Sequence, residues 1–166
     1  MRWVCSAAGI AVVIVLAACR SSGLAPSAAS TVPAMKSVPF SEVATTQHAN
    51  YDGGAEIIVG SSSSARGTIM GRVNTATPPS TAVLVGIFQG EQRTGGHAIQ
   101  TIRIERLGDK LLVHTTFTAP PADGFVTQVI TSPAHVVSIA VSDLAGAKTA
   151  ILLDQAGAER ARTDIT

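Results

Sequence analysis

Hydrophobic and polar residues alternate in short runs over the second half of the chain, and this pattern predicts a β-rich domain. Residues 82–88 read AVLVGIF and predict a buried strand, because nearly every position is apolar and several side chains are β-branched. Residues 97–106 alternate between apolar and charged side chains. We therefore expect Ile102 and Ile104 to share one face of a strand.

The alternation continues beyond a Gly-Asp pair at residues 108–109, which predicts a hairpin turn. The returning strand is expected to place four side chains on one face: Leu111, Val113, Thr115 and Phe117. Pro120-Pro121 then interrupts the pattern, since proline cannot donate a hydrogen bond to a sheet. Residues 125–131, 135–141 and 150–153 predict three further strands.

Upstream, residues 55–59 predict another short strand, and residues 64–71 predict a short helix that a serine caps. Short strands at close spacing, with turn residues between them, are typical of a small antiparallel β-sandwich or a barrel-like domain. We therefore predict a mainly β fold with one short helix over an open side.

The N-terminus follows a different pattern, in which Met1-Arg2 precedes an uncharged apolar run that ends in Leu16-Ala17-Ala18-Cys19. This run is shorter than the ~20 residues that a membrane-spanning helix needs. One positive charge, an apolar run and small residues before a cysteine resemble a bacterial lipoprotein signal peptide. The resemblance implies export, lipid transfer to the Cys19 thiol, cleavage before Cys19 and acylation of the new amine, for example with palmitate. A membrane-spanning segment or a buried helix is the alternative.

A lipid at Cys19 predicts a protein anchored in the bacterial cell envelope. In bacteria with two membranes, Arg20 at the next position favours the outer membrane. Residues 19–38 are rich in Ser, Ala and Pro and predict a flexible tether. We expect the β-rich domain at residues 39–154 and a frayed polar tail at residues 155–166.

Cleavage before Cys19 would leave 148 of the 166 residues, which is enough for one domain with a real core. Removing Arg2 reduces the 12 basic residues to 11, equal to the 11 acidic residues. The chain has no basic cluster, so the composition argues against nucleic-acid binding. Cys5 lies in the signal peptide and Cys19 carries the lipid. The predicted domain therefore has no cysteine for disulfides, zinc thiolates or thiol catalysis.

Residues 82–141 carry an ordered set of motifs. A β-branched strand leads to a Gly-x-x-x-Thr-Gly-Gly loop at residues 90–96, and an alternating strand and a hairpin follow. Pro120-Pro121, Thr131-Ser132-Pro133 and a closing strand at residues 136–141 complete the set. In this order they resemble the C-terminal domain of the bacterial protease complex subunit PrcB family. The resemblance implies a non-catalytic domain that is associated with a surface protease complex.

We single out the loop at residues 90–97 as a candidate partner-binding site, because glycine lacks Cβ and allows close backbone approach. Its candidate residues are Gly90, Arg93, Thr94, Gly95, Gly96 and His97. The loop at residues 120–125 is expected to share the same face. His97 and Ala134 stand where the family usually has aromatic residues. The alternative is a tight turn or bulge that only starts the next strand.

Three histidines, His97, His114 and His135, fall in neighbouring predicted strands. A metal site needs several converging ligands, and no His-Glu-x-x-His is present, so we expect solvent-facing histidines and no metal. The serines at residues 61–64 lack the spacing of a catalytic motif, so we expect no enzyme and no cofactor.

The expected partners are a protease or another envelope protein, together with the membrane through the lipid. Two alternatives stay open. One is a protease-inhibitor-like binding domain, and the other is a structural envelope lipoprotein without a discrete partner.

Overall fold

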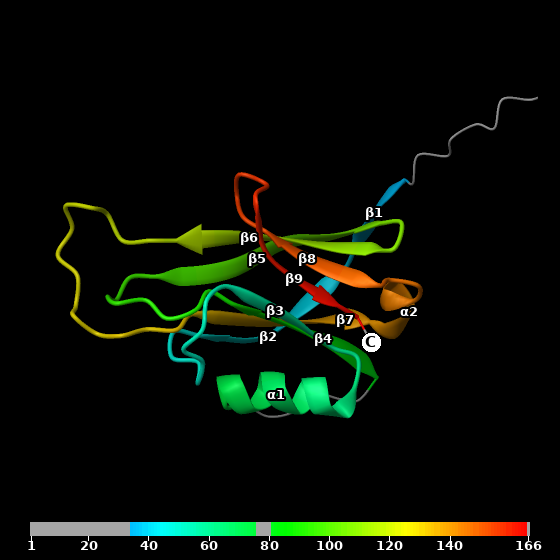
Figure 1. The fold of residues 1–166 in the computed structure, drawn as a ribbon, viewed down its shortest axis with the longest axis horizontal. Helices are drawn as coiled ribbons and strands as arrows, with labels where there is room; N and C mark the ends of the chain where they lie inside the picture. The colour runs from blue at the N-terminus through cyan, green and yellow to red at the C-terminus, as the bar shows by residue number, and fades with distance from the viewer. Residues whose placement is uncertain (1–33, 76–80, 166) are drawn as a thin grey trace, which may run out of the picture. The chain divides into compact units, whose positions relative to one another are not determined.

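Two β-sheets and a helix on the outer face of one of them make up the fold (Figure 1). The structure is a computed structural model that describes residues 34–75 and 81–165. The predicted signal peptide at residues 1–18, the lipidation residue Cys19 and the tether up to residue 33 lie outside the described residues.

The first sheet has the strand order β1-β5-β6-β8-β9. Its strands are β1 (Met35–Val38), β5 (Ala98–Leu107), β6 (Lys110–Thr118), β8 (Thr149–Leu153) and β9 (Glu159–Asp164). The second sheet has the order β2-β7-β4-β3. Its strands are β2 (Phe40–Thr46), β7 (Ala134–Ala140), β4 (Ala82–Phe88) and β3 (Glu56–Gly60). The helices are α1 (Ser63–Val73) and α2 (Val141–Leu144). The predicted β-rich fold with one short covering helix is therefore confirmed as a two-sheet sandwich, not a closed barrel.

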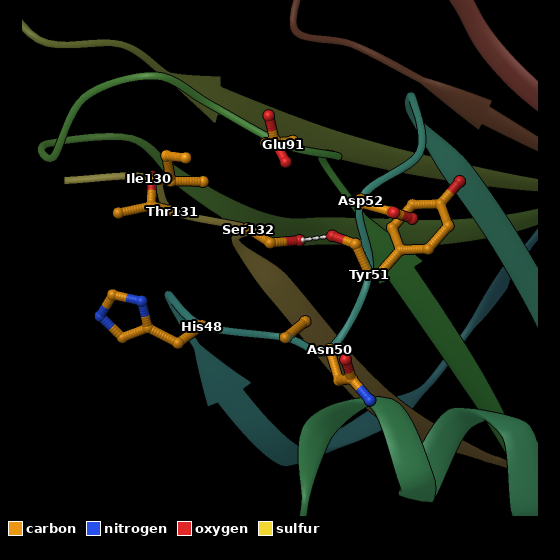
Figure 2. Close-up of a pocket in the computed structure, with 9 residues that line it drawn as sticks. His48, Asn50, Tyr51, Asp52, Glu91, Ile130, Thr131 and Ser132 are labelled. Carbon is orange, nitrogen blue, oxygen red and sulfur yellow. Dashed lines mark hydrogen bonds between the residues drawn. The ribbon is translucent and has the colours of Figure 1, made fainter.

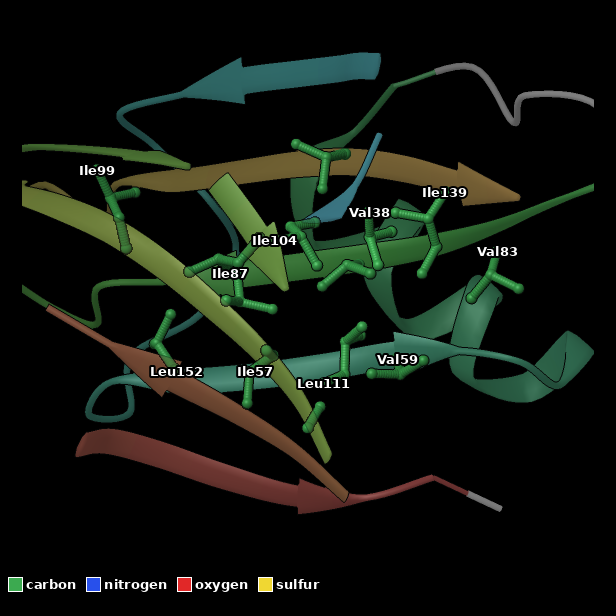
Figure 3. Close-up of a cluster of buried hydrophobic side chains, with 14 residues drawn as sticks. Val38, Ile57, Val59, Val83, Ile87, Ile99, Ile104, Leu111, Ile139 and Leu152 are labelled. Carbon is green, nitrogen blue, oxygen red and sulfur yellow. The ribbon is translucent and has the colours of Figure 1, made fainter. Parts of the chain in front are cut away.

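The main core lies between the two sheets, and Figure 3 shows its aliphatic side chains. Strand β4 explains the layering, because its side chains alternate between two cores. Val83, Val85 and Ile87 face the first sheet. Leu84 and Phe88 face α1 in a second core. Each of these buried side chains contributes about 1.5–3 kcal/mol relative to an exposed one.

Helix α1 is longer at both ends than the sequence predicts. Ser62 caps its N-terminus, where the Ser62 hydroxyl accepts the Ala65 N–H at 3.2 Å. The helix ends at Asn74, which adopts a left-handed conformation with φ of 49°. Ile69 and Val73 are buried against the second sheet. In the described ranges, neither helix is long and apolar enough to cross a membrane.

The expectation that Ile102 and Ile104 share one face is wrong. Ile104 is fully buried, whereas Ile102 is 55% exposed. The β5–β6 pairing shifts between Thr101 and Arg103, so Ile102 is the extra residue of a β-bulge. One extra residue reverses the alternation. Thr101 and Ile104 therefore face the core instead.

The predicted tether and tail are both shorter than expected. Residues 35–38, placed in the tether, form β1, which pairs with β5 and buries Val38 in the main core. Residues 159–164, placed in the polar tail, form β9, which pairs with β8. Both strands lie at the edges of the first sheet, and most of their side chains are exposed. Their sequences are therefore polar and lack the apolar alternation that predicts a strand.

Two further expectations about pairing are corrected. Residues 125–131 form no strand, apart from an isolated bridge between Gln92 and Thr131. The first sheet is mixed, because β6 and β8 run parallel. Strand β7, which follows β6 in the chain, belongs to the second sheet. Helix α2 then leads back to the first sheet, where β8 lies beside β6.

Candidate functional site

Three loops meet at one end of the sandwich, which we call the loop end: residues 47–55, 89–97 and 119–133. The strand register places them together. Phe88 and Thr46 both pair with Ala134 in the second sheet, and Ala98 pairs with Thr118 in the first sheet. In Figure 1 the third loop extends beyond the sheets, at the end away from the β5–β6 turn.

Thr131 and Ser132 hold the three loops to one another. Gln92 and Thr131 exchange backbone hydrogen bonds at 2.7 and 2.9 Å, and the Thr131 hydroxyl donates to the Thr94 carbonyl at 3.0 Å. The Ser132 hydroxyl donates to the Tyr51 carbonyl at 2.6 Å, and the Ser132 N–H donates to the Gln47 carbonyl at 2.8 Å (Figure 2). Both hydroxyl-bearing residues are buried. The Thr-Ser-Pro motif thus fixes the frame of the loop end.

The glycines of the Thr-Gly-Gly loop also serve this frame. Gly90 has φ of +87°, and a Cβ there would lie 2.3 Å from the Gly53 carbonyl oxygen. Gly96 has φ of +86°, a conformation that favours glycine. The Gly95 N–H donates to the Thr127 carbonyl at 3.0 Å, which joins the second loop to the third.

The six predicted site residues do share this loop, but they differ in exposure. Gly90 and Gly95 are buried, and Thr94 and His97 are half-buried, with 3.3 Å between the Thr94 hydroxyl and His97 Nε2. Arg93 and Gly96 are exposed. The residues that define the motif therefore form mostly scaffold and contribute little contact surface.

The third loop presents a larger exposed surface, of which the sequence places Phe125 on the expected face but not Val129 and Ile130. Phe125 is fully exposed, Ile130 is 64% exposed and Val129 is 47% exposed. The sequence predicts a strand over residues 125–131, whereas Val129 and Ile130 lie in a loop and are exposed. All three lie on the third loop, and exposed apolar side chains gathered on one part of a surface mark interaction sites.

Two hollows flank these apolar side chains. The first has a volume of about 320 Å³ and lies between residues 48–52 and residues 130–132, with Glu91 beside it (Figure 2). The second has a volume of about 420 Å³. It lies between Gly95-Gly96, the Pro120-Pro121 pair and residues 125–127.

Tyr51 forms part of the wall of the first hollow. Its ring lies 5.4 Å from the Phe88 ring, and the Arg72 guanidinium lies 4.2 Å from the Tyr51 ring centre. Burial, and then the hydrogen bond to Glu56, raise the pKa of Tyr51 to about 12. The phenol is therefore neutral at physiological pH and is not prepared to act as a base.

The three histidines lie in separate environments. His97 is in the second loop, and His114 Nε2 lies 2.8 Å from the Glu105 carboxylate on the outer face of the first sheet. His135 is 2% exposed and sits between the sheets, so the expectation of a solvent-facing side chain is wrong for it. Among the described residues no group of three His, Cys, Asp or Glu side chains is placed to hold a metal ion.

His135 connects the two sheets. Its Nδ1 accepts the Thr101 N–H at 2.9 Å, next to the β-bulge of β5. Its Nε2 lies 3.2 Å from a Glu42 carboxylate oxygen. The hydrogen bond from His135, then that from Thr45, lower the pKa of Glu42.

Comparison with known proteins bears on the segment that runs from β4 to β7. Residues 83–140 match the PrcB C-terminal family model. The resemblance expected from the sequence motifs is therefore confirmed. The matched segment includes the second and third loops, with both the Thr-Gly-Gly and the Thr-Ser-Pro motifs. No curated protein and no solved structure matches the chain significantly.

Proposed function

We propose that this protein is a lipid-anchored, non-catalytic binding protein of the bacterial cell envelope. Its loop end docks a protein partner, as an accessory to a surface protease complex or as its stabiliser. The observation that carries the proposal is the exposure of Phe125, Val129 and Ile130 on a loop that Thr131 and Ser132 anchor by buried hydrogen bonds. A rigid frame with exposed loop residues is the usual form of a binding site on a β-sandwich.

The state of the hydroxyl groups supports binding over catalysis. A nucleophilic hydroxyl needs a base within hydrogen-bond reach. Here the hydroxyls of Thr131 and Ser132 donate to backbone carbonyls instead, and so does that of Thr115, which donates to Leu153 at 2.9 Å. The Thr94 hydroxyl lies 3.3 Å from His97 Nε2, but no group among the described residues orients that ring, because the buried His97 Nδ1 has no hydrogen-bond partner there. The PrcB C-terminal match supports the association with a protease complex.

The test is an affinity pull-down with cross-linking, using the lipidated protein expressed in its own host. We expect one dominant protease in stoichiometric amount with the wild-type chain. The double variant Phe125→Ser, Ile130→Ser should lose this protease. The variant Ile102→Ser is the matched control, because Ile102 is an exposed apolar side chain outside the loop end.

Two results would contradict the proposal. One is capture of the same protease by the double variant, which would exclude the loop end as the docking surface. The other is the absence of any specific partner while the protein is present in the membrane fraction, which would favour a structural envelope role.

A further inference from the structure

We infer that the loop end binds an extended peptide segment that carries basic side chains next to apolar ones. This inference rests on the proposed function and names the chemistry of the partner segment. It is carried by an unpaired backbone edge, by the apolar side chains beside that edge, and by an excess of negative charge around it.

Residues 126–130 contain no helix, turn or bend, and the segment has one backbone edge occupied by the second loop. Thr127 and Thr131 use that edge, through the Gly95 N–H and through Gln92. In an extended segment the intervening residues point their N–H and C=O groups the opposite way. Within the part of the chain that the structure describes, Gln128 and Ile130 form no backbone hydrogen bond.

The unpaired edge at Gln128 and Ile130 continues to Ser132, whose backbone groups are hydrogen-bonded. Ser132, two residues after Ile130, points its N–H to Gln47 and its C=O to Ala49, at 2.8 and 2.9 Å. An added peptide strand along Gln128 and Ile130 would therefore continue a line of hydrogen bonds that already exists. Addition of a strand to an exposed edge is a common mode of peptide recognition.

Apolar groups and hollows lie beside the edge. Ile130 borders the hollow of about 320 Å³, and Phe125 borders the hollow of about 420 Å³. Side chains of an extended peptide alternate in direction, so successive residues can enter a hollow and face solvent in turn. This spacing fits a segment with apolar residues at alternate positions.

Charge selects among such segments. The loop end carries three carboxylates, Asp52, Glu91 and Asp123, against one guanidinium, Arg93. Asp52 and Glu91 both line the hollow beside Ile130 (Figure 2). Among the described residues these three carboxylates form no ion pair with another side chain. The complementary segment therefore carries Lys or Arg.

The place where the chain enters the domain favours a protein over a lipid surface. Met35 pairs with Leu107, at the end of β5 that is opposite to Ala98 and the loop end. Ten strand residues span about 30 Å. A lipid at Cys19 would therefore pull on the end of the sandwich that lies away from Phe125.

The test uses the full chain in phosphatidylcholine vesicles, where zwitterionic headgroups do not attract charged peptides. The chain's single tryptophan is Trp3, so Phe125→Trp in a Trp3→Phe background gives one reporter at the loop end. The probes are acetyl-Val-Lys-Val-Lys-Val-Lys-Val-amide and the same peptide with Glu in place of Lys. We expect a saturable blue shift of Trp emission, with the Lys peptide bound about tenfold or more tightly than the Glu peptide.

Matched variants locate the contacts. Glu91→Gln should weaken binding of the Lys peptide by about two- to fivefold. Asp109→Asn, in the β5–β6 turn at the other end, should leave it unchanged. Ile130→Ser should weaken binding about fivefold or more, and Ile102→Ser should not.

Several outcomes would overturn the inference: no binding, equal binding of the two peptides, or equal effects of Ile130→Ser and Ile102→Ser. Quenching of the reporter by brominated lipid without peptide would assign the surface to the membrane. If neither peptide binds while the pull-down still yields the protease, only the peptide inference fails. If the Lys peptide is preferred while the pull-down yields no partner, the proposed function fails and the chemistry of the site stands.

Discussion

His135 connects the two sheets, and its removal tests how much that connection stabilises the fold. The ring is buried, and its Nδ1 accepts the Thr101 N–H at 2.9 Å. A neutral imidazole that accepts at Nδ1 carries its proton on Nε2, so the Nε2–H donates to Glu42. The variant His135→Ala leaves the buried Thr101 N–H without this acceptor.

The expected loss of stability follows from these contacts. An unsatisfied buried N–H costs about 1–3 kcal/mol. Loss of the packed ring adds about 1 kcal/mol. The contact with Glu42 adds less than about 1 kcal/mol, because that carboxylate is largely exposed. We therefore expect His135→Ala to lower the free energy of unfolding by about 2–5 kcal/mol.

The assay is urea unfolding of the full chain in detergent, together with hydrogen exchange at the Thr101 amide. His114→Ala is the control, because His114 lies on the outer face and pairs with Glu105 there without joining the two sheets, and it should cost less than about 1 kcal/mol. His135→Asn can present an amide oxygen where Nδ1 lay, so it should retain part of the protection of the Thr101 amide. A loss below about 1 kcal/mol for His135→Ala, with unchanged Thr101 exchange, would refute the reasoning.

Four other predictions concern the lipid anchor, two glycines and the response to acid. Cys19→Ala should abolish metabolic labelling with palmitate and release the protein from the membrane fraction. Gly90→Ala should lower the free energy of unfolding by about 2 kcal/mol or more, because φ is positive and a Cβ would meet backbone. Gly71→Ala in the open face of α1 should raise it by about 0.5–1 kcal/mol in the same urea titration. The folded-state pKa of Glu42 is lowered, so its stabilising contribution is complete above the ordinary value of 4.5 and is lost as pH falls through the folded pKa. Glu42→Gln should therefore reduce the loss of stability measured by urea unfolding between pH 5 and pH 3, and an unchanged pH dependence would contradict this.

The sequence predicts the buried strands well, because their side chains are apolar on one or both faces. Residues 82–88 and the hairpin around residues 108–109 form the predicted structure. The sequence does not predict the edge strands β1 and β9. Their exposed side chains are polar, so these strands show no apolar alternation. The orientation of Ile102 is not predicted for another reason. A single inserted residue reverses the alternation, and the neighbouring Thr101 N–H donates to His135, which lies 34 residues further along the chain.

The site was predicted in part. The motifs located the loop at residues 90–97 correctly at one end of the sandwich, beside the loop at residues 120–125. The contribution of residues 47–55 could not be predicted, because these residues join the site through tertiary contacts such as the hydrogen bonds to Ser132 and Glu91. Such contacts depend on the tertiary fold and leave no local pattern.

The motifs and the contact surface have different tasks, and this difference bears on how binding specificity arises. Thr94, Thr131 and Ser132 form hydrogen bonds within the protein. These bonds fix the position of the third loop just before β7. Residues 119–130 between these anchor points have few internal hydrogen bonds. Substitutions there can change the partner at little cost to the fold, whereas substitutions in the motifs remove the frame. Specificity should therefore be sought at Phe125 and Ile130, outside the residues by which the domain is recognised.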